Sequence, residues 1–158
     1  DNIVQEVRIQ EKMNRDGNNL LYLLEPIRDA WGDGVVNGEF KGLDYFIENL
    51  NELKLSGKPS VQLRPHPSDP SGKYDEWISV QSNLNISLDK SVTLAESIAW
   101  SDVVVGCQTY AMVIALAAGK QVFSSVPPWA PSCVLPQEDI IKISELAYKK
   151  SSMADINN

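Results

Sequence analysis

The fold class is decided by the segment DVVVG at 102–106. Three consecutive valines between Asp102 and Gly106 make a short, continuous apolar run, which is typical of a strand buried on both faces of a parallel sheet. The run leads through CQT at 107–109 into an apolar stretch with helical character that Gly119 ends, as glycine commonly does at a helix C-terminus. A buried strand that turns directly into a helix is the repeating unit of α/β proteins.

The same strand–helix unit recurs on both sides of this segment. We expect strands at 20–24, 60–64, 84–88, 102–106 and 121–124. Helices are expected to alternate with them at about 40–55, 74–80, 93–100, 109–118 and 137–149. Such alternation gives a parallel sheet covered by helices on both faces. The sequence therefore predicts a Rossmann-like, three-layer α/β/α domain with a parallel sheet of about five strands.

The predicted domain does not take up the whole chain. Residues 1–18 are expected to be a polar N-terminal segment, either a short helix or a linker, because DGNN at 16–19 breaks regular structure. The Rossmann-like domain is expected over 19–150 and a C-terminal tail over 151–158. Because the chain opens with Asp1 rather than methionine, we expect it to be a fragment of a longer protein.

Composition excludes several classes of partner. A net charge of −7 argues against nucleic acid, whose phosphate backbone requires a basic surface. No stretch approaches the ~20 apolar residues that span a bilayer. Neither Cys107 nor Cys133 has the spacing of metal ligands, so no metal or other cofactor is expected. The lack of a disulfide framework fits a cytoplasmic location, and Cys107 is predicted to be a small buried residue.

The motif RPHP at 64–67 follows the second predicted strand. It holds the only histidine of the chain, His66. The flanking prolines stiffen the backbone on both sides of it. Ligands of open parallel sheets bind beyond the carboxyl ends of the strands, where an imidazole can donate a hydrogen bond to a phosphate oxygen. The alternative is a solvent-facing or packing histidine in a turn.

A second candidate follows the fourth strand, at Gly106, Cys107, Gln108 and Thr109. Gly106 permits close approach of the backbone. The free N–H groups at the start of the next helix are predicted to bind an anion, with the Thr109 hydroxyl beside them. A single glycine makes this neither a dinucleotide fingerprint nor a P-loop. The alternative is an ordinary helix N-cap.

Three further positions are weaker candidates. Glu25, at the end of the first strand, is expected either to bind ligand or to pair with Arg28. Ser91 and Thr93 lie in a loop that could face a base or a ribose, although Thr93 with Glu96 also has the spacing of a capping box. The tryptophans at 31, 77 and 100 are predicted to be packing residues.

The residues singled out above resemble a known family. The stretch SDVVVG at 101–106, Gln108-Thr109 and ALAAGK at 115–120 together resemble the donor-binding domain of glycosyltransferases with two facing Rossmann domains, the GT-B architecture. The RPHP motif resembles the His-Pro motif of bacterial sialyltransferases and polysialyltransferases, and a similar motif of glycerophosphate-type polymerases. The resemblance implies that His66 contacts the phosphate of a cytidine nucleotide.

The resemblance also implies a division of roles. Arg64 and His66 would stabilise the departing nucleotide phosphate as the catalytic residues. The nucleotide part of the donor would be bound by residues that follow the strands: Gly106, Gln108, Thr109, Ser91, Thr93 and Glu25. The donor would be a nucleotide sugar, bound as substrate, and 19–150 would be its nucleotide-binding domain.

Two departures from the family pattern refine this expectation. Ile114 stands where many members carry an acidic residue for the donor ribose, which favours a CMP- or CDP-linked donor. The acceptor domain, which usually supplies the catalytic base, is missing, so the chain is not expected to be active alone. Two alternatives stay open: a nucleotide-sugar 2-epimerase-like domain, and a non-catalytic α/β interaction module such as a receiver-like domain, in which Asp89 would follow a strand end.

Overall fold

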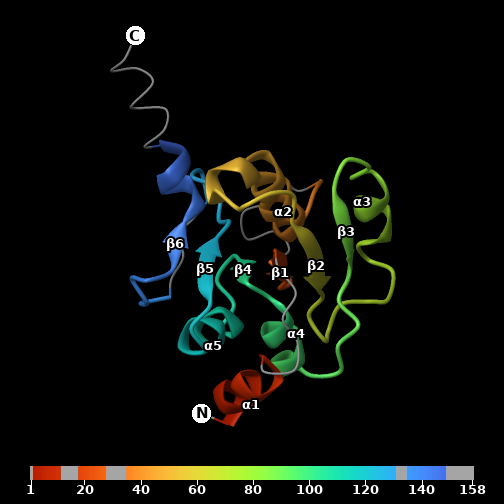
Figure 1. Ribbon diagram of the computed structural model, residues 1–158. Helices are drawn as coiled ribbons and strands as arrows, with labels where there is room; N and C mark the ends of the chain where they lie inside the picture. The colour runs from red at the N-terminus through yellow and green to blue at the C-terminus, as the bar shows by residue number, and fades with distance from the viewer. Residues whose placement is uncertain (1, 12–17, 28–34, 131–134, 149–158) are drawn as a thin grey trace.

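The computed structural model describes residues 2–11, 18–27, 35–130 and 135–148 (Figure 1). Its strands form one parallel six-stranded sheet in the order β3-β2-β1-β4-β5-β6. The strands are β1 (Asn19–Leu23), β2 (Ser60–Arg64), β3 (Asn85–Leu88), β4 (Val103–Gly106), β5 (Gln121–Ser124) and β6 (Ile141–Lys142). The helices are α1 (Asn2–Glu11), α2 (Gly38–Glu48), α3 (Asp75–Ser79), α4 (Leu94–Trp100) and α5 (Ala111–Ala117). The predicted Rossmann-like α/β fold is confirmed.

The strand order fixes where a ligand can bind. From β1 the chain builds outward through β2 to β3, and it then returns to the other side of β1 for β4, β5 and β6. The direction therefore reverses between β1 and β4, and Rossmann domains bind ligands outside the carboxyl ends of strands at such a point. Receiver domains have the flavodoxin-like order 2-1-3-4-5, so the receiver-like alternative is wrong.

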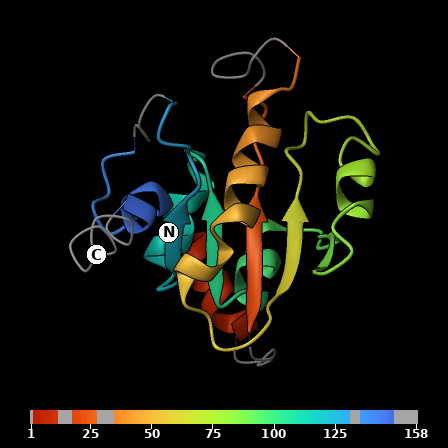
Figure 2. The same cartoon turned by 90° about the horizontal axis from the view of Figure 1, so that it is seen from above.

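Both faces of the sheet are covered, which explains the unbroken apolar run of β1. Leu20 and Tyr22 point into one apolar cluster with Leu43 and Phe46 of α2. Successive side chains of a strand alternate between faces, and Leu21 and Leu23 accordingly join a second cluster with residues of α1, α4 and α5. Figure 2 shows α2 across one face of the sheet and α1 with α4 behind it.

The N-terminal segment contains the short helix that was one of its two predicted forms. Val7 of α1 is fully buried in the second apolar cluster, with Ile3 and Val4 packed at its edge. The helix lies mainly against α4. Among the described residues, no helix has the length and apolar character needed to cross a membrane.

The C-terminal part differs from the prediction. The helix expected over 137–149 begins later, because 138–139 form a turn, β6 follows, and helical structure starts only at 143. Ile141 and Lys142 pair with Phe123 and Ser124 of β5. β-Branched isoleucines at 140, 141 and 143 favour extended structure, and the apolar spacing concealed that preference. Strand β6 thus adds a sixth strand to the sheet of about five that the sequence predicts.

The long helix expected over 40–55 is divided in two. Helix α2 ends at Glu48, and a 3-10 turn covers Leu50–Leu53. The side chain of Asn49 donates to the carbonyl oxygen of Tyr45 at 2.9 Å, and such local bonds of asparagine compete with helix continuation. The apolar spacing persists through the break, which is why the sequence predicted a single helix.

Gly119 ends α5 as predicted. It has a φ of +87°, and its N–H donates to the carbonyl of Leu116 at 3.0 Å. The N–H of Lys120 donates to Ala115 at 3.1 Å. These two bonds make a Schellman motif, in which a residue with positive φ satisfies the last helical carbonyls.

Gly106 is needed by the packing of the protein itself. A Cβ atom at this position would lie 3.2 Å from the carbonyl oxygen of Leu23 and 3.0 Å from the sulfur of Met112. We expect Gly106→Ala to lower the free energy of unfolding by about 1–3 kcal/mol, as overpacking does, in urea denaturation. Ser87→Ala, at an exposed position of β3, is the control and should change it by less than about 0.5 kcal/mol. Equal stability of both variants would contradict this account.

Candidate functional site

The two predicted motifs lie at the same edge of the sheet. The RPHP motif follows β2, and Gly106–Thr109 follows β4. Strand β1 lies between β2 and β4, and the residues that follow it, 24–27, therefore run between the two motifs. We call this region, at the carboxyl ends of β2, β1 and β4, the candidate site.

Glu25 joins the two halves of the candidate site. One of its carboxylate oxygens accepts a hydrogen bond from the backbone N–H of Gln108 at 2.7 Å. Burial is the main influence on the carboxyl and raises the pKa of Glu25. The N–H of Gln108, the charge of His66 and the N–H of Thr109 oppose that rise. Glu25 is therefore bonded to the turn after β4, and the RPHP motif lies at the end of the neighbouring strand β2.

One of the N–H groups after β4 is already hydrogen-bonded within the protein, which corrects one expectation. The start of the helix after β4 was predicted to offer free N–H groups to an anion, but the N–H of Gln108 donates to Glu25. Helix α5 begins only at Ala111, rather than at Thr109, and Tyr110 precedes it. The carboxylate thus holds the place where a phosphate was expected.

His66 is exposed, and it is held in one orientation by its own loop. Its Nδ1 accepts a hydrogen bond from the backbone N–H of Ser68 at 3.1 Å and lies 2.8 Å from the Ser68 hydroxyl. A ring nitrogen that accepts an N–H bond carries no proton, so the neutral ring carries its proton on Nε2. The exposure rules out the packing alternative, and Nε2–H is the donor that His66 can offer.

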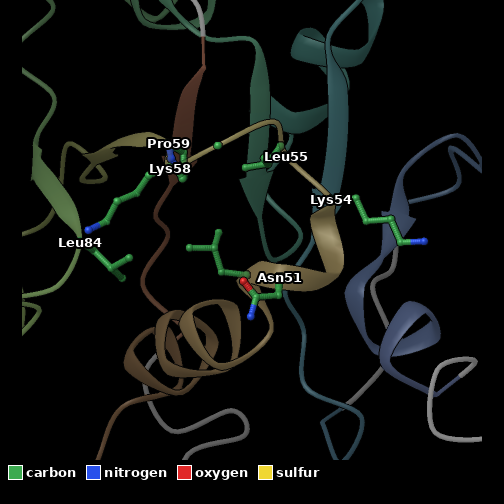
Figure 3. A pocket seen from close by; sticks show the side chains of 8 residues that line it. Asn51, Lys54, Leu55, Lys58, Pro59 and Leu84 are labelled. Atoms are coloured by element: carbon green, nitrogen blue, oxygen red, sulfur yellow. The ribbon is translucent and has the colours of Figure 1, made fainter. Parts of the chain in front are cut away.

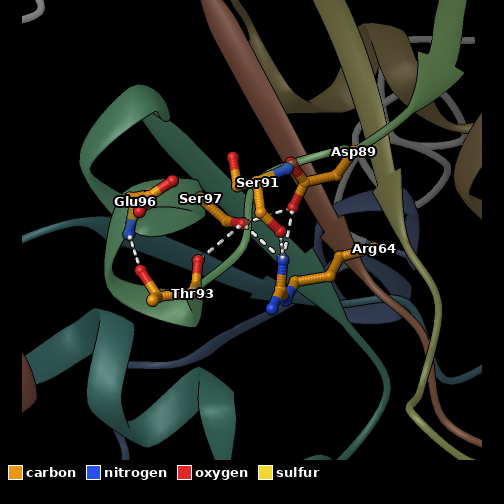
Figure 4. A network of polar contacts seen from close by, with 6 residues as sticks. All are labelled: Arg64, Asp89, Ser91, Thr93, Glu96 and Ser97. Carbon is orange, nitrogen blue, oxygen red and sulfur yellow. Dashed lines mark hydrogen bonds and ion pairs between the residues drawn. The ribbon is translucent and has the colours of Figure 1, made fainter.

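Arg64 lies in a network of polar contacts that joins β2 to the loop after β3 (Figure 4). Its Nη1 donates to Asp89 at 3.0 Å, to the carbonyl of Ser91 at 3.1 Å and to the hydroxyl of Ser97 at 2.9 Å. The Ser97 hydroxyl also donates to Asp89. This arginine therefore anchors β2 to the loop after β3 and to α4, and its catalytic role stays a prediction.

The loop before α4 is ordered by the same network. The N–H of Ser91 donates to Asp89 at 2.9 Å. The Thr93 hydroxyl accepts from the N–H of Glu96 at 3.2 Å, which makes Thr93 the N-cap of α4. The capping interpretation of Thr93 is confirmed, whereas contact of Ser91 or Thr93 with a ligand stays a prediction. Sequence analysis missed Ser97, whose signal is a serine among the apolar residues on the buried face of α4.

Cys107 is a buried packing residue, as predicted. It is 3% exposed, and its sulfur lies 3.7 Å from the hydroxyl of Tyr22 and 3.6 Å from that of Ser125. The Tyr22 and Ser125 hydroxyls are 2.6 Å apart, and Ser124 donates to the Cys107 carbonyl at 2.7 Å. Burial raises the pKa of Tyr22 well above its ordinary value. This buried network fixes the turn that carries Gln108.

Some predicted positions lie outside the described residues, namely Arg28, Trp31 and Cys133. Within the described part of the chain, no group of three or more His, Cys, Asp or Glu side chains could hold a metal ion.

A hollow of about 360 Å³ lies at the opposite edge of the sheet, before β2 (Figure 3). Leucine, proline and lysine side chains form much of its wall, and the residues labelled there are Asn51, Lys54, Leu55, Lys58, Pro59 and Leu84. It contains neither a carboxylate nor a histidine. None of the predicted site residues lies in it.

The fold is shared with two solved Kdo transferase structures. Thermosulfurimonas dismutans KpsC, beta Kdo 2,7 transferase, matches at a TM-score of 0.50 and 16% identity, over 92% of this chain and 51% of that one. Thermosulfurimonas dismutans KpsC, beta Kdo 2,4 transferase, matches at a TM-score of 0.52 and 11% identity, over 89% of this chain and 46% of that one. The chain thus spans about half the length of either structure. No family model and no curated protein sequence matches it.

Asp89 makes the stability of the candidate site dependent on pH. Burial is the largest influence and by itself raises the pKa of Asp89. The hydrogen bonds from Ser97, from the N–H of Ser91 and from Arg64 together outweigh it, so the pKa is lowered. A lowered folded-state pKa contributes stability that is fully present above the unfolded value of about 3.9. That stability is lost as pH falls through the folded value.

We expect Asp89→Asn to lower the free energy of unfolding at neutral pH by about 3 kcal/mol, because Arg64 would lose the buried carboxylate that it pairs with. The variant should also lose less stability than wild type on acidification below about pH 4. Urea denaturation at a series of pH values measures both effects. Asp139→Asn, at an exposed position, is the matched control. An acid dependence equal to that of wild type in Asp89→Asn would disprove the assignment.

Glu25 is expected to have the opposite pH dependence. Because its folded-state pKa is raised, its contribution to stability is fully present below the ordinary value of 4.5 and is lost as pH rises through the folded value. Glu25→Gln keeps an oxygen for the N–H of Gln108 but cannot ionise. We therefore expect thermal denaturation of this variant to show no such loss of stability between about pH 4 and 7. Exposed Glu138→Gln should retain it. Strong destabilisation by Glu25→Gln at neutral pH would refute the interpretation.

Proposed function

We propose that this chain is the donor-nucleotide-binding half of a glycosyltransferase of the GT-B architecture. Its strand order is the one that binds nucleotides at the carboxyl edge of the sheet. The chain also has the length of about half of two Kdo transferases whose fold it shares. In this proposal the other half is a second Rossmann-like domain, which binds the acceptor and supplies the catalytic base.

One observation carries the proposal. Glu25, which follows β1, accepts a hydrogen bond from the backbone N–H of Gln108, which follows β4, and His66 follows the neighbouring strand β2. Polar groups from three adjacent strand ends thus lie at the edge where the strand order reverses. Ligand sites of open α/β sheets are built at this position.

The charges suggest how a nucleotide would be oriented. A carboxylate repels phosphate but accepts hydrogen bonds from hydroxyl and amino groups, so we place the nucleoside toward Glu25. The phosphate would lie toward His66, whose Nε2–H can donate to an oxygen that gains negative charge as the sugar departs. Arg64 would add positive charge from within its network with Asp89.

The donor class is proposed from α5. Ile114 packs at the edge of the second apolar cluster, so the position that carries a ribose-binding acid in many GT-B enzymes presents no carboxylate here. This supports a CMP- or CDP-linked sugar over donors that depend on that acid.

Exposed apolar side chains support a facing partner domain. Val35, Val92, Tyr110 and Trp129 are exposed, and they lie in the segments that follow β1, β3, β4 and β5. Apolar residues gathered at one edge are typical of a surface that another protein part covers. The second half of the enzyme would cover them while closing over the donor.

The proposal is tested by titrating the chain with CMP, CDP and UDP. We expect CMP or CDP to bind more tightly than UDP. His66→Asn should weaken binding about tenfold or more, since a hydrogen bond to a charged group contributes about 1.5–3 kcal/mol. His66→Gln, whose amide can reach the position of Nε2, should retain more of the affinity. Calorimetry or NMR measures these affinities.

Two results would overturn the proposal. One is the absence of binding by any of the three nucleotides at millimolar concentration. The other is an unchanged affinity in both His66 variants. The first result would favour the non-catalytic interaction module, whose partner would then contact the same exposed edge.

A further inference from the structure

A buried ionic cluster lies beside the candidate site and consists of Glu39, Asp69 and Lys73. The ammonium of Lys73 lies 2.9 Å from Asp69 and 3.4 Å from Glu39. The two carboxylate side chains are only 3% and 1% exposed, and that of Lys73 is 16% exposed. Carboxylates buried to this degree require a cation and hydrogen bonds to remain charged.

The cluster holds the backbone of two different loops. The backbone N–H of His66 donates to Asp69 at 3.2 Å, and the N–H of Asp69 donates back to the carbonyl of His66 at 2.9 Å. On the other side, the N–H of Ile27 donates to Glu39 at 2.6 Å. Ile27 stands two residues after Glu25. Lys73 therefore bridges one carboxylate that fixes the His66 loop and another that fixes the segment carrying Glu25.

Aromatic packing limits the freedom of this bridge. Lys73 lies 5.3 Å from the ring centroid of Tyr74, and the Tyr74 hydroxyl donates to Asp69 at 3.4 Å. The Tyr74 ring in turn packs on Phe40 of α2, with 5.2 Å between centroids. The ammonium is thus enclosed by groups from α2 and from the loop after β2, which favours a single geometry.

We infer that Lys73 is a positioning residue that sets the separation of His66 and Glu25 by linking their loops through Asp69 and Glu39. The consequence for nucleotide binding rests on the proposed function, whereas the link itself does not. None of the contacts that define the link joins Lys73 directly to His66 or Glu25. Lys73 acts on them through the carboxylates of Asp69 and Glu39.

The link is tested by hydrogen exchange of two backbone amides, measured by NMR on the full chain. In Lys73→Met we expect the amides of His66 and Ile27 to exchange at least about tenfold faster than in wild type. Lys73→Arg keeps a cation between the carboxylates and should restore most of the protection. Lys58→Met, a lysine exposed at the opposite edge, is the matched control and should change neither amide. Unchanged protection of Ile27 in Lys73→Met would overturn the inference.

A second variant serves if Lys73→Met does not fold. Asp69→Asn keeps an oxygen for the N–H of His66 but removes the charge that Lys73 contacts. Faster exchange at Ile27, which Asp69 does not contact by any bond of the cluster, is then the expected result. Exchange altered only around His66 would show two independent loops and would overturn the link.

Nucleotide titration gives the readout at the site. If wild type binds CMP, Lys73→Met should weaken binding about tenfold, Lys73→Arg should recover most of it, and Lys58→Met should bind as wild type does. Equal CMP affinity in Lys73→Met and wild type would reject the positioning role. If wild type binds no nucleotide, the proposed function fails, and the amide exchange rates alone decide whether the link exists.

Discussion

The structure depends on the parallel pairing of β1 with β2 on one side and with β4 on the other. Apolar side chains cover both faces of β1, so the strand cannot shift by one residue without exchanging the two clusters. The segment after β1 is therefore held in a fixed place between the ends of β2 and β4. Leu24 donates to Arg64, Glu25 accepts from Gln108, and Ile27 donates to Glu39. One short stretch therefore contacts the end of β2, the turn after β4 and helix α2.

Sequence predicted the fold well because its signals were local. Apolar runs marked β1 and β4, and Gly119 marked the end of α5. Strand β6 escaped prediction because two residues, Ile141 and Lys142, become a strand only by pairing with β5. The break after Glu48 also escaped, because the apolar spacing continues across it.

The candidate site was predicted in position more successfully than in detail. Topology alone brings the segments after β1, β2 and β4 to one edge. The contacts within the site join residues far apart in the chain, such as Glu25 with Gln108 and Arg64 with Ser97, and no periodicity encodes such pairs. Burial raises the pKa of both Glu25 and Asp89, but at Asp89 the hydrogen bonds outweigh burial, so the two pKa values move in opposite directions.

The two outermost strands of the sheet, β3 and β6, are short and polar. Strand β3 has four residues and exposes Asn85 and Ser87, whereas β6 has two residues and carries Lys142. Unpaired edge strands are templates for intermolecular pairing, and brevity with polar or charged side chains counters it. Both flanks of the sheet therefore resist pairing with a second copy of the chain, which would extend the sheet from one molecule to the next.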